Sequence, residues 1–149
     1  MFKTFAVITL LAASTYASAN NTPAQCATLD KEHAKILFER WNDALQTGDS
    51  SKVVANYTPD AVLLPTLSNQ PRTDLAGKVD YFDKFLKNKP VGTLDSSTVI
   101  SSCNSTIDTG TYTFRFSDNS AVSARYTFTY ALIDNQWLIT SHHSSAMPE

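Results

Sequence analysis

The sequence has no basic stripe, little charge and, beyond its first 19 residues, no apolar run long enough to cross a membrane. Charged residues make up 17% of the chain and the formal net charge is −2. Nucleic-acid binding is not expected, because it needs lysines and arginines that neutralise phosphates. An HExxH zinc site, a nucleophile elbow, a phosphate-binding loop and a dinucleotide fingerprint are also missing. We therefore expect no metal and no cofactor.

The start of the chain has the pattern of a secretory signal peptide. Lys3 supplies the positive charge, residues 5–13 form an apolar run too short to span a bilayer, and residues 17–19 read Ala-Ser-Ala, as a signal peptidase requires. We expect cleavage after that triplet, which makes residues 1–19 the signal peptide. A polar leader over 20–27 and one domain over 28–149 would follow, in a periplasmic or secreted protein without membrane contact. An uncleaved anchor or a buried helix is the alternative.

The chain contains only two cysteines, Cys26 and Cys103. Outside the cytoplasm, an even number of cysteines permits a disulfide. Such a bond would tie the start of the first helix to a central strand. The alternative is a pair of buried free thiols. Neither cysteine is expected to be a nucleophile, because nothing nearby in the sequence would activate it.

Apolar spacing predicts helices in the first half of the chain and strands in the second. An apolar stripe at three- and four-residue intervals predicts a helix over residues 28–47. A short helix, a turn at 57–60 and a strand over 61–64 follow, and a third helix spans 74–86. From Leu94 onward, the threonine-, serine- and aromatic-rich composition is typical of strands.

Two segments of the strand half alternate between polar and aromatic residues. In residues 111–116 and 123–130, the aromatic residues take the even positions and the polar residues the odd ones. A three-residue loop at 118–120 keeps aromatics opposite aromatics and pairs Thr113 with Arg125.

A turn at Asp134-Asn135 predicts a second hairpin. A two-residue loop there pairs Thr127 with His142 and Arg125 with Ser144, so this register separates a polar face from an aromatic face. The predicted polar face consists of Arg115, Arg125, Thr113, Thr127, Thr129, Thr140, His142 and Ser144. The predicted aromatic face consists of Tyr112, Phe114, Phe116, Tyr126, Phe128, Tyr130, Trp137, Ile139 and His143.

The order of these elements resembles the nuclear transport factor 2-like fold. Residues 125–128 form an arginine strand, 134–139 a hairpin with a tryptophan, and 142–148 a histidine followed by serine and proline. This ending is similar to that of the association (hub) domain of calcium/calmodulin-dependent protein kinase II, and the similarity extends from about residue 29 to residue 148. The resemblance implies an α+β cone, with a curved antiparallel sheet wrapped on three N-terminal helices.

The resemblance also implies self-association, because in the kinase this domain assembles dimers into rings. Each subunit there keeps a pocket that contains arginines. Arg125 falls on the position of one pocket arginine and Arg115 near a second, whereas Ser144 replaces a further arginine. His143 matches the histidine of the closing motif. The chain has no kinase domain and no calmodulin-binding helix, so neither activity is implied.

We expect a polar pocket between the first helix and the face that carries Arg125, because the guanidinium fork suits a carboxylate or phosphate. The aromatic face would then point outward and be covered by another subunit, in a homodimer or a larger ring. The alternative is an exposed polar face, with the aromatic face packed against the helices. The candidate ligand-binding residues are Arg125, Arg115, Thr113, Thr127, His142 and Ser144.

Two functional hypotheses follow. The first is a non-catalytic, exported, self-associating domain that binds a small anion. The second is a cofactor-independent isomerase, cyclase or hydratase related to SnoaL-like cyclases or ketosteroid isomerases, with His142 or Asp60 as the acid–base group and Tyr57 or Tyr81 as an oxyanion donor. Asp60 alternatively caps a turn, and the tyrosines are alternatively core residues. His142 and His143 do not predict a metal site, because neighbours in a strand point to opposite faces.

Overall fold

The computed structural model describes residues 26–66 and 68–148, so the predicted signal peptide and most of the predicted leader lie outside the described residues. The predicted helices and the strand-rich second half are confirmed. Residues 57–60, predicted as a turn, instead belong to a strand whose register is irregular between Tyr57 and Val62. In chain order, the elements are α1 (Lys31–Gln46), α2 (Ser50–Val54), β1 (Tyr57–Leu64), α3 (Leu75–Phe85), the 3-10 helix η1 (Leu86–Asn88), β2 (Val91–Ser102), β3 (Ser105–Arg115), β4 (Ala121–Ile133) and β5 (Gln136–Ala146).

An aspartate caps the N-terminus of each α-helix. The carboxylates of Asp30, Asp49 and Asp74 accept hydrogen bonds from backbone N–H groups of the first turns of α1, α2 and α3. These bonds satisfy donors that have no partner inside the helix. At the other end of α1, Gly48 adopts φ +68°, the left-handed conformation that ends a helix.

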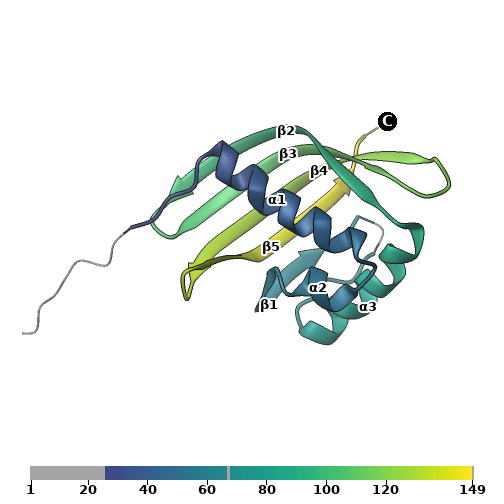
Figure 1. Ribbon diagram of the computed structural model, residues 1–149, viewed down its shortest axis with the longest axis horizontal. Helices are drawn as coiled ribbons and strands as arrows, with labels where there is room; N and C mark the ends of the chain where they lie inside the picture. The colour runs from purple at the N-terminus through teal and green to yellow at the C-terminus, as the bar shows by residue number, and fades with distance from the viewer. Residues whose placement is uncertain (1–25, 67, 149) are drawn as a thin grey trace, which may run out of the picture.

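The strands form one curved sheet in the order β1-β5-β4-β3-β2. β2 to β5 are antiparallel neighbours, but β1 pairs with β5 in parallel, so the sheet is mixed rather than wholly antiparallel as predicted. Figure 1 shows α1 lying across one face of the sheet, with α2 and α3 beside β1 at one end. This is the cone-like α+β architecture that the sequence predicted.

The hairpin of β3 and β4 keeps the predicted faces but not the predicted pairs. Thr113 pairs with Ser123 and Thr111 with Arg125, because the connection occupies residues 116–120. The predicted pairing was wrong by two residues. A shift by an even number leaves every side chain on its predicted face, so the alternation of polar and aromatic residues survives.

The hairpin of β4 and β5 follows the prediction only near its turn. Tyr130 pairs with Ile139 as predicted, but the register then shifts at a bulge, and Phe128 pairs with His142. A shift by one residue exchanges the faces of everything beyond it. His142 and Ser144 therefore lie on the aromatic face, and His143 lies on the polar face, opposite to the prediction.

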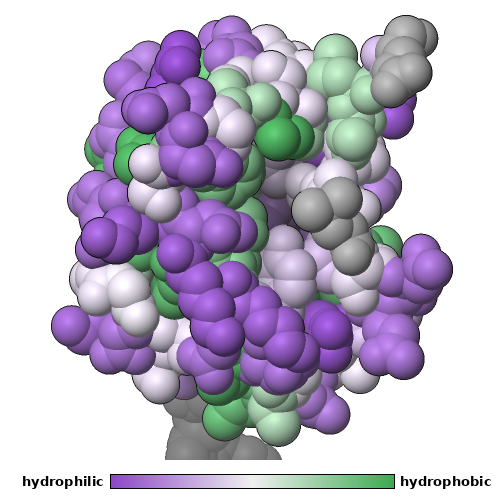
Figure 2. Space-filling view, turned by 90° about the vertical axis from the view of Figure 1, so that its right-hand side faces the viewer, coloured by the Kyte–Doolittle hydropathy of each residue, from purple (hydrophilic) through white to green (hydrophobic). Residues whose placement is uncertain are grey.

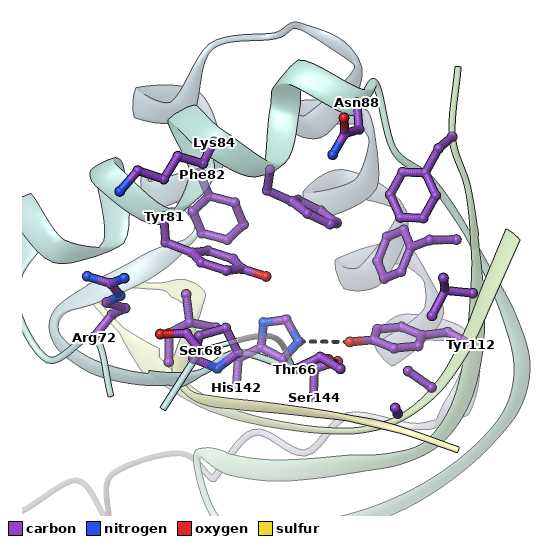
Figure 3. Close-up of a pocket in the computed structure, with 18 of the residues that line it drawn as sticks. Thr66, Ser68, Arg72, Tyr81, Phe82, Lys84, Asn88, Tyr112, His142 and Ser144 are labelled. Carbon is purple, nitrogen blue, oxygen red and sulfur yellow. Dashed lines mark hydrogen bonds between the residues drawn. The ribbon is translucent and has the colours of Figure 1, made fainter. Parts of the chain in front are cut away.

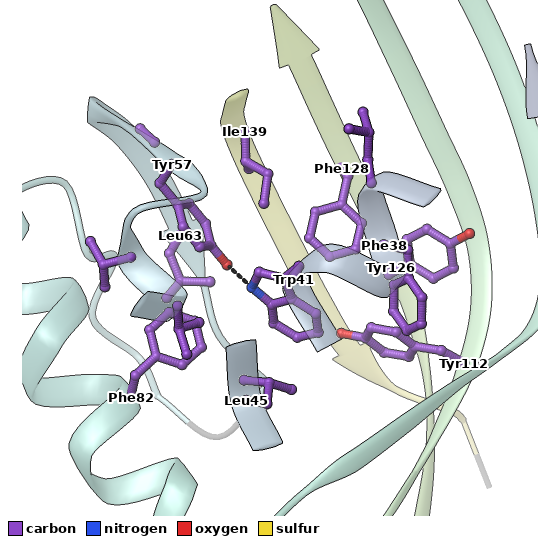
Figure 4. Close-up of a cluster of buried hydrophobic side chains, with 14 of the residues drawn as sticks. Phe38, Trp41, Leu45, Tyr57, Leu63, Phe82, Tyr112, Tyr126, Phe128 and Ile139 are labelled. Carbon is purple, nitrogen blue, oxygen red and sulfur yellow. Dashed lines mark hydrogen bonds between the residues drawn. The ribbon is translucent and has the colours of Figure 1, made fainter. Parts of the chain in front are cut away.

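The aromatic face is buried beneath α1, which contradicts the prediction that it points outward. Phe38 and Trp41 of α1 pack against Phe128, with ring centroids 6.4 and 5.5 Å apart (Figure 4). The apolar stripe of α1 needs an apolar surface to cover it, and only this face of the sheet provides one. Arg115 and Arg125 are exposed on the outer face, so the predicted pocket between α1 and Arg125 does not form.

Cys26 and Cys103 form the predicted disulfide. Cys103 lies in the turn between β2 and β3, however, and not in a central strand. Next to the bond, the Asn104 side chain accepts a hydrogen bond from the Ala27 N–H, and the Asn104 N–H donates to the Ala27 carbonyl. The bond therefore fastens the segment before α1 to a hairpin end. No helix in the described ranges is long and apolar enough to cross a membrane.

Candidate functional site

A cavity of about 570 Å³ opens at the end of the molecule where α3, the loop after β1, the hairpin of β3 and β4 and the end of β5 meet. Figure 2 shows a hollow at this end of the molecule. Its polar floor consists of Thr66, Tyr112, His142 and Ser144, and its phenylalanine wall consists of Phe82, Phe85, Phe114 and Phe116.

His142 is the centre of the polar floor. Its ring is 4% exposed and stacks on Phe128 with centroids 4.0 Å apart. Its Nδ1 lies 2.9 Å from the Tyr57 hydroxyl. Its Nε2 lies 3.4 Å from the Tyr112 hydroxyl (Figure 3). The indole N–H of Trp41 donates to the same Tyr57 oxygen at 3.0 Å. Both nitrogens of the imidazole therefore face a hydroxyl.

The groups around His142 are neutral. Burial, with a smaller effect of His143, lowers the pKa of His142 from 6.5 to about 3. Burial also raises the pKa of Tyr57 and of Tyr112, and it raises the pKa of Tyr81 to about 12. At physiological pH, the imidazole of His142 and these three phenols are thus uncharged.

Two further hydroxyls meet beside the histidine. Ser144 follows His142 by two positions on β5, so both side chains point to the same face. The Thr66 Oγ1, in the loop after β1, lies 2.5 Å from the Ser144 Oγ. The Tyr81 hydroxyl from α3 also points into the cavity toward His142 (Figure 3). One hydroxyl of the Thr66–Ser144 pair keeps a hydrogen for a ligand, because one hydrogen suffices for the bond between them.

Positive charge lies at the side of the cavity and not on its floor. Arg72 and Lys84 both line it, and both contact Asp80, at 3.5 and 2.8 Å. The backbone of Arg72 is fixed by two hydrogen bonds with Leu63, of 2.8 and 2.9 Å. The two cations thus share one carboxylate partner, and a second carboxylate, Asp118, also lines the cavity.

Only some of the candidate site residues predicted from the sequence line the cavity. His142 and Ser144 line the cavity. The other candidates, Arg115, Arg125, Thr113 and Thr127, lie on the outer face of the sheet. Asp60 is exposed and lies outside the cavity lining.

Sequence reasoning nominated Tyr81 as a donor, but it missed Thr66, Arg72 and Tyr112. Tyr112 carried a signal, because it belongs to the aromatic face that packs under the helix. Thr66 and Arg72 lie in a loop without periodicity, so no local pattern marked them. Within residues 26–66 and 68–148, no three His, Cys, Asp or Glu side chains gather as a metal-ligand group.

A cone of helices and a curved mixed sheet, with a cavity at its open end, defines a nuclear transport factor 2-like protein. A structure of this class from Pseudomonas putida matches with a TM-score of 0.70 and 18% identity, covering 80% of this chain and 87% of that chain. The iota-carbonic anhydrase of a cyanobacterium, solved with bicarbonate, matches with a TM-score of 0.73 and 17% identity, covering 87% of this chain and 99% of that one. At these identities, the two structures share the fold.

The particular family follows from the sequence match. The model of the calcium/calmodulin dependent protein kinase II association domain matches residues 30–148, and the chain belongs to this family. A crystal structure assigned to this domain, from Xanthomonas campestris, is 42% identical with a TM-score of 0.77 and covers 92% of this chain and 99% of that chain. No curated protein matches the chain significantly. The resemblance inferred from the closing motif is thereby confirmed.

Proposed function

We propose that this protein is a cofactor-independent hydratase whose substrate is carbon dioxide and whose product is bicarbonate. The observation that carries the proposal is the polar floor, where a buried neutral histidine lies between two tyrosine hydroxyls and beside the Thr66–Ser144 pair. The shared fold with a carbonic anhydrase that binds bicarbonate supports this choice of substrate. The product is then a small anion, the kind of ligand that the first sequence hypothesis expected, but its proposed site lies on the inner face of the sheet.

The reaction joins the oxygen of a water molecule to the carbon of carbon dioxide. The electron pair of one C=O bond moves onto its oxygen, and one proton of the attacking water leaves to solvent through the mouth of the cavity. In the proposed arrangement, the Thr66–Ser144 pair orients the water, and His142 with Tyr112 offers polar contacts to the oxygen that gains charge. The phenylalanine wall accommodates the apolar substrate, and the nearby cations Arg72 and Lys84 attract the anionic product.

The hydration rate of carbon dioxide, followed by stopped flow with a pH indicator, tests the proposal. We expect hydration above the uncatalysed rate both before and after treatment with a chelator. Ser144→Ala removes one hydroxyl of the pair and should lower kcat/KM about 100-fold. His143→Gln, on the outer face one residue away, should leave it unchanged. Activity that disappears on chelation and returns with added zinc would overturn the metal-independent proposal, as would hydration at the uncatalysed rate throughout.

We also propose that the chain is exported and self-associates. The Cys26–Cys103 bond fits an oxidising compartment, and the association-domain family suggests self-oligomerisation. The outer face of the sheet is the proposed contact, because Ile100 and Ile107 pair there and are 60% and 38% exposed. Neighbouring apolar side chains on an exposed face are typical of a contact surface.

A further inference from the structure

A chain of hydrogen bonds runs from α1 through β1 to the polar floor. It joins the Trp41 indole, the Tyr57 hydroxyl and the His142 imidazole at 3.0 and 2.9 Å. The three side chains are 1%, 5% and 4% exposed, so water does not compete for these bonds. Figure 4 shows the Trp41 N–H directed at the Tyr57 oxygen inside the cluster of buried side chains.

The first bond determines the direction of the second. An indole N–H only donates, so the Tyr57 oxygen is an acceptor toward Trp41. The hydroxyl hydrogen of Tyr57 also needs an acceptor. Among the described residues, the acceptor in reach is His142 Nδ1. If Nδ1 carried a hydrogen instead, two N–H groups would point at one oxygen, and the Tyr57 hydrogen would be buried without an acceptor. Buried polar groups in that state are rare and unfavourable.

We propose that Trp41 and Tyr57 are positioning residues that hold His142 as the neutral tautomer with its hydrogen on Nε2. The imidazole then always presents an N–H donor to the cavity. The Tyr57 hydroxyl in the protein core, and not the ligand, fixes the hydrogen on Nε2. Its contact in the free protein, the Tyr112 hydroxyl at 3.4 Å, is long. A substrate oxygen therefore replaces a weak bond and not a strong one. The use of this donor in hydration rests on the proposed function, but the tautomer itself does not.

The tautomer is measured directly by two-dimensional ¹⁵N–¹H NMR of the imidazole rings in the ¹⁵N-labelled full chain. We expect His142 to show a protonated Nε2 and an unprotonated Nδ1 at neutral pH, and His142→Gln identifies its signals. A protonated Nδ1 in the wild-type protein would overturn the proposal, whatever the variants do.

Tyr57→Phe keeps the ring in the core and removes the hydroxyl. We expect its His142 to show a mixture of both tautomers, and its kcat for hydration to fall about tenfold with KM for carbon dioxide unchanged. Trp41→Phe, which frees the Tyr57 oxygen to accept from Nδ1–H, should shift the tautomer ratio in the same direction. An unchanged tautomer in Tyr57→Phe would contradict the positioning role.

The two proposals fail in different ways. An Nε2–H tautomer in a protein that does not hydrate carbon dioxide would reject the proposed function and support the positioning role. Hydration by a protein whose His142 carries its hydrogen on Nδ1 would reject the positioning role alone. His143→Gln, whose side chain lies on the outer face, should alter neither measurement.

Discussion

At the scale of single residues, the polar floor of the site consists of groups that are uncharged. His142 reaches this state by burial, which makes a proton on its ring unfavourable, and Tyr57 and Tyr112 keep their protons for the same reason. A catalyst made of such groups acts by donating and accepting hydrogen bonds, not by supplying a full charge. Its donors also keep their protonation state across physiological pH.

His142 should also make the stability of the fold depend on pH. Its pKa is about 3 in the folded chain, against an ordinary value of 6.5, so below pH 6.5 the unfolded chain takes up a proton that the folded chain excludes. The stability present above pH 6.5 is therefore lost as the pH falls toward 3. Between pH 6 and 4, this group should lower the free energy of unfolding by about 1.4 kcal/mol per pH unit.

Urea unfolding curves at several pH values, followed by tryptophan fluorescence, measure this dependence. The slope of the free energy of unfolding against pH gives the number of protons taken up on unfolding. This number should be smaller by about one in His142→Gln. It should keep the wild-type value in His143→Gln, because that ring is exposed on the outer face. Equal slopes in the wild type and His142→Gln would show that the ring of His142 titrates normally.

At the scale of elements, irregularities in two strands shape the inner face. The bulge in β5 turns His142 inward, and a register shift between Leu94 and Ser96 bends β2 where it passes Gly110 of β3. A β-carbon built on Gly110 would lie 2.1 Å from the Ser96 carbonyl oxygen. The close approach of these two backbones therefore requires glycine at this position.

Replacing Gly110 with alanine should lower the free energy of unfolding by about 3 kcal/mol, because the backbones must separate to admit the methyl group. Gly48→Ala is the matched comparison. It has a φ of +68° but no atom within 4 Å of the added carbon, so only the backbone conformation is unfavourable. We expect it to lose about 1 kcal/mol. Equal losses in urea unfolding would mean that β2 and β3 adjust freely at the bend.

At the scale of the whole molecule, the fold separates the site from the proposed contact surface. The cavity opens at one end of the cone, whereas the outer face of the sheet carries threonines, Arg125, His143 and the Ile100–Ile107 pair. A partner subunit on that face would leave the mouth of the cavity accessible. The proposed association and the proposed reaction would therefore use different surfaces.

Size-exclusion chromatography with light scattering tests the assembly. We expect the protein to have at least twice the mass of one chain, and Ile107→Lys to shift it toward the monomer, because a charge at an apolar contact must be desolvated. Ile36→Lys is the control, since Ile36 is 58% exposed on α1 and away from the sheet. A wild-type protein that is monomeric at all concentrations would contradict self-association.

The local features of this protein could be predicted from the amino-acid sequence alone. The alternation in residues 111–116 and 123–130 determined which side chains share a face of β3 and β4, because a strand repeats every two residues whatever surrounds it. The apolar stripe at residues 28–47 predicted the first helix, and the closing motif was specific enough to indicate the family. Each of these properties depends on neighbouring residues in the chain.

Which face points inward, and where the β5 register changes, could not be predicted from local patterns. Both depend on contacts between distant segments, since the aromatic face is buried by α1 and the bulge sets His142 against Phe128, Trp41 and Tyr57. The same packing brings Thr66 from a loop to Ser144 on a strand. A one-residue register shift leaves the local pattern unchanged and yet exchanges the roles of His142 and His143, which is why the sequence named His142 and Ser144 as site residues but placed them on the wrong face of the sheet.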